Sequence, residues 1–259
     1  MNGRLESPAP RLAADEVHLW HARVEEIADP ALLARYFQLL CEEEARRQQR
    51  FVFERDRHLY LVSHALVRTC LSLYVDVDPC AWRFVCNRYG RPEVAWPATT
   101  PALRFNLSHT RGMAVVAVAL ERDIGVDVED VSRREASVGI AEHYFSPSEV
   151  HDLRAMHAAA QHAAFFDYWT LKEAYIKARG MGLSLPLKQF SFHFSSARDR
   201  VRISFDPELG DDPESWQFEQ FQVAARHKIA VAARQGPGQE LRFIARPNVP
   251  LLDPPASKI

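Results

Sequence analysis

The sequence lacks a surplus of charge of either sign. It holds 32 Lys and Arg against 34 Asp and Glu, which gives a net charge of −2. A composition this balanced does not indicate a nucleic acid or a membrane as the partner. Any site that binds an anion must therefore be a local group of basic residues.

Cysteine is also scarce, and the cysteines form no pattern that binds metal. No two of them have the spacing C-x-x-C, and no histidine cluster completes a zinc site around them. We expect them to be reduced thiols in a cytoplasmic protein. The four are Cys41, Cys70, Cys80 and Cys86.

Long apolar runs are absent as well. The longest, MAVVAVAL, covers only residues 113–120, far short of the roughly 20 residues that cross a bilayer. The opening sequence, MNGRLESPAP, contains no apolar core of a signal peptide. We therefore expect a cytoplasmic protein that does not insert into a membrane.

What remains is the composition of a common globular protein. Of the 259 residues, 47% are hydrophobic and 25% are charged, so a sizeable core can form. The length suits one large domain or two units of roughly 100–130 residues each. Residues 1–16 are expected to be a loose N-terminal segment, and residues 247–259 an irregular tail.

Two stretches of the sequence have the same pattern, a helix followed by a strand. Residues 56–74 carry apolar side chains at helical spacing and precede the aromatic-rich segment 82–86. Residues 163–179, which end at Gly180, precede the alternating segment 190–194. The repetition favours an α+β fold made of two similar units.

Two further patterns lie between these stretches. Residues 113–120, a turn at 121–123 and residues 124–129 are expected to form a β-hairpin. Ser146-Pro147-Ser148-Glu149 has the sequence of a capping box, with Ser at the cap, Pro at the first helical position and Glu at the third.

The segment Gly125-Val126-Asp127-Val128-Glu129 places two carboxylates on one face of a predicted strand. Successive side chains of a strand alternate between faces, so Asp127 and Glu129 point the same way. They lie about 7 Å apart by the strand repeat, a separation that suits a shared hard cation such as Mg²⁺. The alternative is a solvated face of a half-buried strand.

In the second predicted helix, Glu173 interrupts an apolar stripe. Phe166, Trp169, Glu173 and Ile176 follow one another at helical spacing. A carboxylate in such a stripe is costly unless a cation or hydrogen-bond donors accompany it. Lys177 follows one turn later, so the alternative is a routine Glu–Lys pair along the helix.

Residues 106–110, Asn-Leu-Ser-His-Thr, offer hydroxyl, imidazole and backbone donors directly before the apolar strand. Such donors can hold phosphate oxygens. Ser108 and His109 are adjacent, and adjacent residues of an extended chain point apart, so they are poorly placed to act as a nucleophile and its base. The alternative is a structural turn.

Arginine is concentrated in one short region of the first half. Arginine suits the recognition of phosphates, although a solvated helix face would have the same composition. The residues concerned are Arg46, Arg47, Arg50, Arg55 and Arg57, followed later by Arg88 and Arg91.

Five motifs together resemble the phosphopantetheinyl transferase superfamily, in its longer, Sfp-type branch. Their order and separations follow the family over residues 40–195. The resemblance implies an α+β fold that is a pseudo-twofold pair of similar α/β subdomains, expected at residues 17–122 and 123–246. The motifs are RYGRP (88–92), FNLSHT (105–110), IGVDVE (124–129), FSPSE (145–149) and WTLKEAYIKARGMGLSLPL (169–187).

The resemblance implies an enzyme, a Mg²⁺-dependent 4′-phosphopantetheinyl transferase, with Mn²⁺ as an alternative metal. It would transfer the phosphopantetheine of coenzyme A (CoA) to a serine of an apo acyl or peptidyl carrier protein and release adenosine 3′,5′-bisphosphate. The carriers would belong to fatty-acid, polyketide or nonribosomal peptide synthesis. We expect a monomer, because one chain holds both halves of the fold. We also expect that the protein binds neither nucleic acid nor a membrane.

The family's functional residues map onto numbered positions of this sequence. Asp127 and Glu129 match its metal ligands. Glu173 matches its third acidic residue, which is expected to be a further metal ligand and is a candidate general base. Asp127, Glu173 and Lys177 form the expected catalytic set. The residues expected to bind CoA are Arg47, Arg50, Arg91, Ser108, His109, Lys172 and Lys177.

Two other classes of protein compete with this interpretation. A non-catalytic module that binds CoA or a nucleotide would be expected to have lost an acidic or lysine position, yet Asp127, Glu129, Glu173 and Lys177 are all present. A metal-dependent phosphodiesterase could use the two carboxylates and a distant glutamate, but it would leave the other motifs unexplained.

Overall fold

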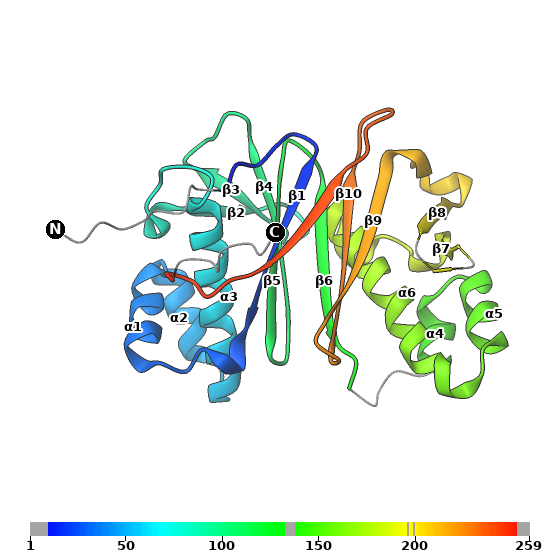
Figure 1. Ribbon diagram of the computed structural model, residues 1–259, viewed down its shortest axis with the longest axis horizontal. Coiled ribbons are helices and arrows are strands. Elements are labelled where there is room, and N and C mark those ends of the chain that lie inside the picture. The colour runs from blue at the N-terminus through cyan, green and yellow to red at the C-terminus, as the bar shows by residue number, and fades with distance from the viewer. Residues whose placement is uncertain (1–9, 133–137, 196, 199, 253–259) are drawn as a thin grey trace. The chain divides into compact units, whose positions relative to one another are not determined.

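The computed structural model describes residues 10–132, 138–195, 197–198 and 200–252. This part of the chain divides into two compact units, and each combines helices with β-sheet (Figure 1). The predicted α+β class is therefore confirmed. Unit 1 consists of Met1–Val85, Glu93–Glu121 and Phe243–Ile259, and unit 2 of Cys86–Pro92 and Arg122–Arg242.

Unit 1 has a four-stranded sheet in the order β11-β1-β5-β4, accompanied by helices. The strands of this sheet are β1 (Glu16–Arg23), β4 (Leu103–Thr110), β5 (Met113–Leu120) and β11 (Arg242–Pro247). The helices are α1 (Pro30–Leu39), α2 (Glu42–Arg50) and α3 (Glu54–Ser72). A short pair of strands, β2 (Arg83–Cys86) and β3 (Pro92–Trp96), follows α3 in the chain.

The helix predicted at residues 56–74 is α3, and it forms the core of unit 1 with β5. Val62, Leu66 and Cys70 on α3 are fully buried. Strand β5 has hydrogen-bonded neighbours on both edges, and it is buried along nearly its whole length. The sequence of a strand that is buried on both faces is a continuous apolar run, because neither face contacts water.

Strand β6 (Ile124–Asp130) does not pair with β5, so the predicted hairpin is wrong, although both strands form. Both edges of β5 are occupied by β1 and β4, whereas β6 pairs with β10 (His227–Arg234) in unit 2. The predicted turn is divided between the units: Glu121 is the last residue of its segment in unit 1, whereas Arg122 and Asp123 belong to unit 2, where the amide of Arg234 donates to the carbonyl of Asp123 at 2.9 Å.

The hairpin forms one strand earlier, between β4 and β5. Thr110 pairs with Met113 across a tight turn at Arg111–Gly112. Gly112 has φ +81°, a conformation that glycine adopts without strain. Residues 106–110 are consequently part of a strand, and their interpretation as a turn is wrong.

Unit 2 has a three-stranded sheet in the order β6-β10-β9, a second pair of strands and helices. The remaining strands are β7 (Phe190–Phe194), β8 (Val201–Phe205) and β9 (Trp216–Val223). The helices are α4 (Val138–Tyr144), α5 (Pro147–Ala155) and α6 (Ala158–Arg179). Strand β11 begins where unit 2 ends and adds to the sheet of unit 1, whereas we expected residues up to 246 in the C-terminal subdomain.

Helix α6 is the organising helix of unit 2. It begins at Ala158 rather than at the predicted Ala163, and it ends where predicted, at Gly180, whose φ of +62° is typical of a helix C-terminus. It packs against β6 and β10, and its buried residues include Phe166, Tyr175 and Ile176. No helix in the described part of the chain is both long and apolar enough to cross a membrane.

The predicted capping box of α5 is present and continues into the core. The Glu149 side chain accepts a hydrogen bond from the amide of Ser146 at 2.9 Å and another from the amide of Phe192 at 2.8 Å. Its other partner is Lys172 of α6, 2.8 Å away. Both side chains are almost completely buried, so this ion pair joins α5, α6 and β7 inside unit 2.

We expect Glu149→Gln to lower the free energy of unfolding by about 3–5 kcal/mol, because it leaves the buried ammonium of Lys172 without its counter-charge. The urea midpoint of the purified variant measures this loss. The control is Glu142→Gln, which breaks an exposed pair with Arg154 and should cost less than about 1 kcal/mol. Equal losses from the two variants would contradict the structural role of Glu149.

Candidate active site

Strand β6 and helix α6 of unit 2 contact each other at Gly125. A Cβ atom at Gly125 would lie 2.1 Å from the carbonyl oxygen of Ala174 and 2.3 Å from the amide nitrogen of Ala178. No side chain fits in that space, so the backbone of the helix rests directly on the strand. Because strand side chains alternate, Asp127 and Glu129 lie on the same face of β6 as Gly125.

Asp127 forms an ion pair with Lys177 across this contact. The two side chains approach to 2.6 Å between Lys177 Nζ and Asp127 Oδ1. Asp127 is buried at 4% exposure, whereas the Lys177 side chain is 28% exposed. The lysine therefore neutralises a buried carboxylate and still reaches solvent.

Glu129, two residues further along β6, is oriented by Trp169. The indole Nε1 of Trp169 donates a hydrogen bond to Glu129 Oε1 at 3.1 Å. The indole ring is itself held by stacking on Phe165, with ring centroids 5.8 Å apart, and by an edge contact with Tyr144. The helix thus fixes both carboxylates of the strand, one through a lysine and one through a tryptophan.

Glu173 lies one turn before Lys177 on α6, and its carboxyl group is electrostatically coupled to the same pair. Burial raises the pKa of Glu173, the negative charge of Asp127 raises it further, and the positive charge of Lys177 partly offsets both effects. A carboxyl group with a raised pKa near a second carboxylate is typical of a site that handles protons or binds a cation.

The oxygen donors of β6 fit a hard divalent cation. Mg²⁺ commonly takes one or two carboxylates and completes its shell with water and substrate phosphates. Asp127 and Glu129 are two carboxylates on one strand face, and Glu173 is close enough for the charge of Asp127 to shift its pKa. The described residues contain no group of three His, Cys, Asp or Glu side chains arranged to hold a metal by themselves.

Lys172, predicted to bind CoA, has a different position from its neighbour Glu173. Besides Glu149, its ammonium donates to the carbonyl oxygens of Leu187 and Phe190, each at 2.8 Å. Burial lowers the pKa of Lys172, and the charge of Glu149 acts in the opposite direction. With three acceptors and 1% exposure, Lys172 holds the core together and offers no free donor to a ligand.

Arg91 lies at the C-terminal end of α6. Its Nη1 donates to the carbonyl oxygen of Ala178 at 2.7 Å, and the nearby Asn87 donates to the carbonyl of Gly180 at 3.0 Å. A cation at this end of a helix is favourable, because the last carbonyl groups carry partial negative charge. The role of Arg91 in binding the nucleotide part of CoA stays a prediction.

Ser108 and His109 occupy adjacent positions of β4 in unit 1. Ser108 is buried and His109 is exposed, as expected for neighbours on opposite faces of a strand. They are thus not arranged as a nucleophile and its base. Their contact with the CoA diphosphate stays a prediction.

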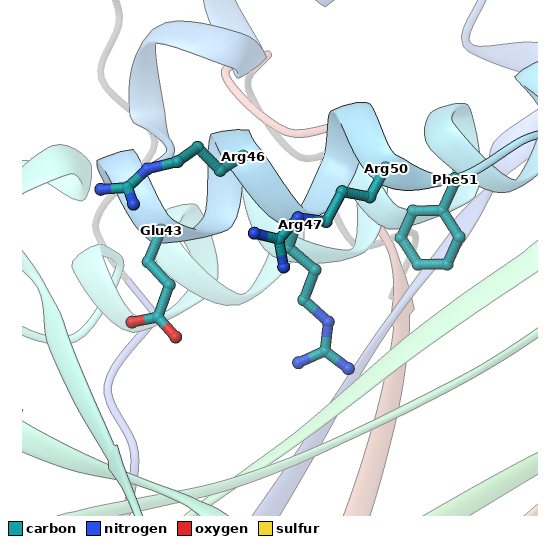
Figure 2. A pocket seen from close by; sticks show the side chains of 5 residues that line it. All are labelled: Glu43, Arg46, Arg47, Arg50 and Phe51. Atoms are coloured by element: carbon teal, nitrogen blue, oxygen red, sulfur yellow. The ribbon is translucent and has the colours of Figure 1, made fainter.

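Arg47 and Arg50 lie beside a hollow on the surface of unit 1, along α2 (Figure 2). The hollow has a volume of about 760 Å³ and is also lined by Glu43, Arg46 and Phe51. The side chain of Arg46 is paired with Glu42 at 2.8 Å, whereas the side chains of Arg47 and Arg50 make no hydrogen bond or ion pair to another described residue. These two guanidinium groups are available to an anionic ligand.

Three contributors to this site were not singled out by sequence reasoning. Trp169 was read only as part of an apolar stripe, and no sequence signal identifies its indole as a donor to Glu129. Gly125 was part of a motif but had no assigned role. Lys228 lies opposite Glu129 in the β6–β10 pairing and forms an ion pair with Asp167 of α6. Only the pairing of β6 with β10, which the sequence pattern does not reveal, could have identified it.

Comparisons with known proteins identify the family. A family model described as the 4′-phosphopantetheinyl transferase superfamily matches residues 123–232, and one described as 4′-phosphopantetheinyl transferase, N-terminal, matches residues 28–121. The chain is 34% identical over 191 residues to a 4′-phosphopantetheinyl transferase of Bacillus subtilis, across 74% of this chain and 80% of the relative. It is 32% identical over 199 residues to 4′-phosphopantetheinyl transferase Sfp of Bacillus subtilis (strain 168), across 77% and 84% respectively.

A solved structure with a more distant likeness is the holo-[acyl-carrier-protein] synthase of Thermotoga maritima. The TM-score is 0.36 at 20% identity, over 44% of this chain and 62% of that chain. A likeness this weak adds nothing to the family assignment, which depends on the sequence matches.

The chain belongs to the 4′-phosphopantetheinyl transferase superfamily. It is an enzyme of that family, and the predicted resemblance to Sfp-type members is confirmed.

We expect Gly125→Ala to separate α6 from β6 and to reduce transfer of phosphopantetheine. Overpacking of this kind costs about 1–3 kcal/mol of stability, and a displacement of about 1 Å in a catalytic group can reduce turnover by about 100-fold. The measurements are the initial rate of carrier modification and the urea midpoint.

The matched control is Gly236→Ala, whose new Cβ would contact only the side chain of Gln239. We expect it to retain turnover within about twofold, because a flexible side chain can move aside. Full turnover of Gly125→Ala would contradict the idea that direct backbone contact assembles the site.

Proposed function

We propose that this enzyme transfers the 4′-phosphopantetheine group of CoA to a serine of an apo carrier protein in a Mg²⁺-dependent reaction. The product besides the modified carrier is adenosine 3′,5′-bisphosphate. One observation carries the proposal: α6 presents Glu173 and Lys177 to Asp127, while Glu129 lies on the same face of β6.

In the proposed reaction, the serine oxygen forms a bond to the β-phosphorus of CoA. The bond from that phosphorus to the oxygen bridging it to the α-phosphate breaks, and the electron pair leaves with the adenosine bisphosphate. Such a transfer needs alignment and charge neutralisation more than covalent chemistry from the protein.

Glu173 would accept the proton of the serine, directly or through a water molecule. Its raised pKa suits this task, because a base is most effective when its pKa approaches the working pH. Lys177 would stabilise negative charge on the phosphates, since its ammonium reaches solvent beside Asp127. Asp127 and Glu129, next to Glu173, would hold Mg²⁺, which when bound supplies neutralisation of the diphosphate charge.

The residues of unit 1 would bind the rest of CoA. The guanidinium groups of Arg47 and Arg50 have no hydrogen-bond or ion-pair partner among the described residues and would hold the 3′-phosphate, while Ser108 and His109 would contact the diphosphate. Arg91 would contact the nucleotide end from unit 2. The carrier proposed is an acyl or peptidyl carrier protein of fatty-acid, polyketide or nonribosomal peptide synthesis, modified by a monomeric enzyme in the cytoplasm.

We expect Glu173→Gln to lower kcat by about 100-fold to 10,000-fold, as loss of a general base does. The substitution keeps the size of the side chain, so the dissociation constant for CoA should stay within about threefold of the parent value. The assay combines enzyme, Mg²⁺, CoA and an apo carrier, and a mass spectrum of the carrier detects the added phosphopantetheine.

The same mass spectrum separates the competing functions. Hydrolysed CoA with an unmodified carrier would indicate a phosphodiesterase, and unchanged CoA would indicate a binding module. Full turnover of Glu173→Gln would exclude Glu173 as the base.

We expect Arg47→Ala to raise the KM for CoA by about 10-fold to 100-fold, the equivalent of losing one charge-assisted hydrogen bond of about 1.5–3 kcal/mol. The control is Arg23→Ala, which removes an exposed arginine that is paired with Glu26. Unchanged KM in Arg47→Ala would show that the hollow along α2 does not bind CoA.

A further inference from the structure

Helix α2 carries the hollow of Arg47 and Arg50, yet it has almost no apolar attachment to the rest of unit 1. No residue of α2 is buried. Its sequence, EEEARRQQR, contains one small apolar residue and offers no hydrophobic stripe. A helix of this composition needs polar contacts to fix its orientation on a protein.

Glu44 provides the strongest of these contacts. Its Oε2 lies 2.7 Å from Nη2 of Arg68, and its Oε1 lies 3.0 Å from Nδ1 of His64, both on α3. Glu44 Oε2 also accepts the amide hydrogen of Cys41 at 2.9 Å, which closes the capping box of α2. The carboxylate of Glu44 therefore takes part in three hydrogen bonds and joins α2 to α3.

Arg68, the ion-pair partner of Glu44, is itself held in place by several contacts. Arg68 is 1% exposed, and its Nη1 donates to the carbonyl oxygens of Trp82 at 2.9 Å and Pro79 at 3.2 Å. Its guanidinium carbon lies 5.2 Å from the centroid of the Phe84 ring. The Nη1 atom of Arg68 is thus held by the two carbonyl groups, while its Nη2 atom faces Glu44 of α2.

The electrostatics agree with a strong contact. Burial alone would raise the pKa of Glu44, but the hydrogen bond from His64 and the charge of Arg68 lower it to about 2. Glu44 is therefore ionised at neutral pH. Further links to α3 are a hydrogen bond of 3.4 Å from Gln48 to the carbonyl of Arg57 and, at Phe51 just after α2, a hydrogen bond of 2.9 Å from Arg57 Nη1 to its carbonyl and a ring contact with Tyr60.

We infer that Glu44 is a positioning residue for CoA, because its bonds to Arg68 and His64 fix the rotation of α2 and so the direction of Arg47 and Arg50. Glu44 and Gln48 lie one turn apart on α2, and both contact α3. Glu43, Arg47 and Arg50 form the adjacent stripe that lines the hollow, as Figure 2 shows. A rotation of α2 that released the first stripe would turn the second away from its ligand.

This inference rests on the proposed function, in which Arg47 binds CoA. The primary variant is Glu44→Gln in the full-length enzyme. Its amide cannot accept from all three donors, and its NH₂ group faces one of them. We expect the KM for CoA to rise by at least about threefold, within the range of coupling between contacting residues. The kcat at saturating CoA and the KM for the apo carrier should stay unchanged.

A double-mutant cycle separates positioning from general damage. If Glu44 acts through Arg47, then Glu44→Gln should add little to the KM of Arg47→Ala, because the group that it directs is already gone. The control is Glu42→Gln, the same change in the first turn of the same helix at an exposed position without contact to α3. We expect its KM for CoA to stay within about twofold.

Three results would overturn the inference. They are an unchanged KM for CoA in Glu44→Gln, a loss of kcat with both KM values raised together, and effects of Glu44→Gln and Arg47→Ala that multiply. If Arg47→Ala itself leaves the KM unchanged, the proposed role of the hollow fails first, and that single variant distinguishes the two failures. Should Glu44→Gln not fold, Arg68→Lys, which keeps the charge but loses the guanidinium fork, is measured against the same expectations.

Discussion

The direct contact between the backbones of β6 and α6 at Gly125 is the constraint on which the active site depends. A side chain at this position would collide with the helix backbone, so only glycine allows the two elements to approach this closely. The approach places Lys177 against Asp127 and Trp169 against Glu129. Without it, the two carboxylates of the strand would lack the groups that neutralise and orient them, and Glu173 would not feel the charge of Asp127.

The same helix serves the core and the site through neighbouring residues. Lys172 is enclosed by Glu149 and two carbonyl groups, while Glu173, the next residue, belongs to the site. Consecutive positions of a helix differ by about 100° in direction, which follows from 3.6 residues per turn. A basic residue next to a candidate site residue in sequence can therefore be enclosed in the core, as Lys172 is.

Patterns confined to one element were predictable from the sequence. The capping box at Ser146, the end of α6 at Gly180, and the shared face of Asp127 and Glu129 all follow from local periodicity and local hydrogen bonding. Glu173 was identified because a carboxylate in an apolar stripe is costly. The same burial raises the pKa of Glu173.

Patterns that depend on which element pairs with which were not predictable. The prediction of a hairpin between β5 and β6 was wrong. Strands adjacent in sequence can pair only if each has a free edge, and both edges of β5 are occupied by β1 and β4. Lys172 was predicted to bind CoA from its match to the family motif, and nothing near it in the sequence indicates its pairing with Glu149 of another helix. Burial and partner choice are long-range properties, and a single sequence does not encode them in any one window.

The burial of Lys172 has a mechanical consequence for the enzyme. Its ammonium is held from three directions, so α6 cannot turn about its own axis without pulling a charge out of its acceptors. As long as the contacts of Lys172 persist, α6 can tilt or shift as a unit, but it cannot rotate about its own axis. Because Glu173 is the next residue on α6, the contacts that restrain Lys172 also restrain the direction in which Glu173 leaves the helix.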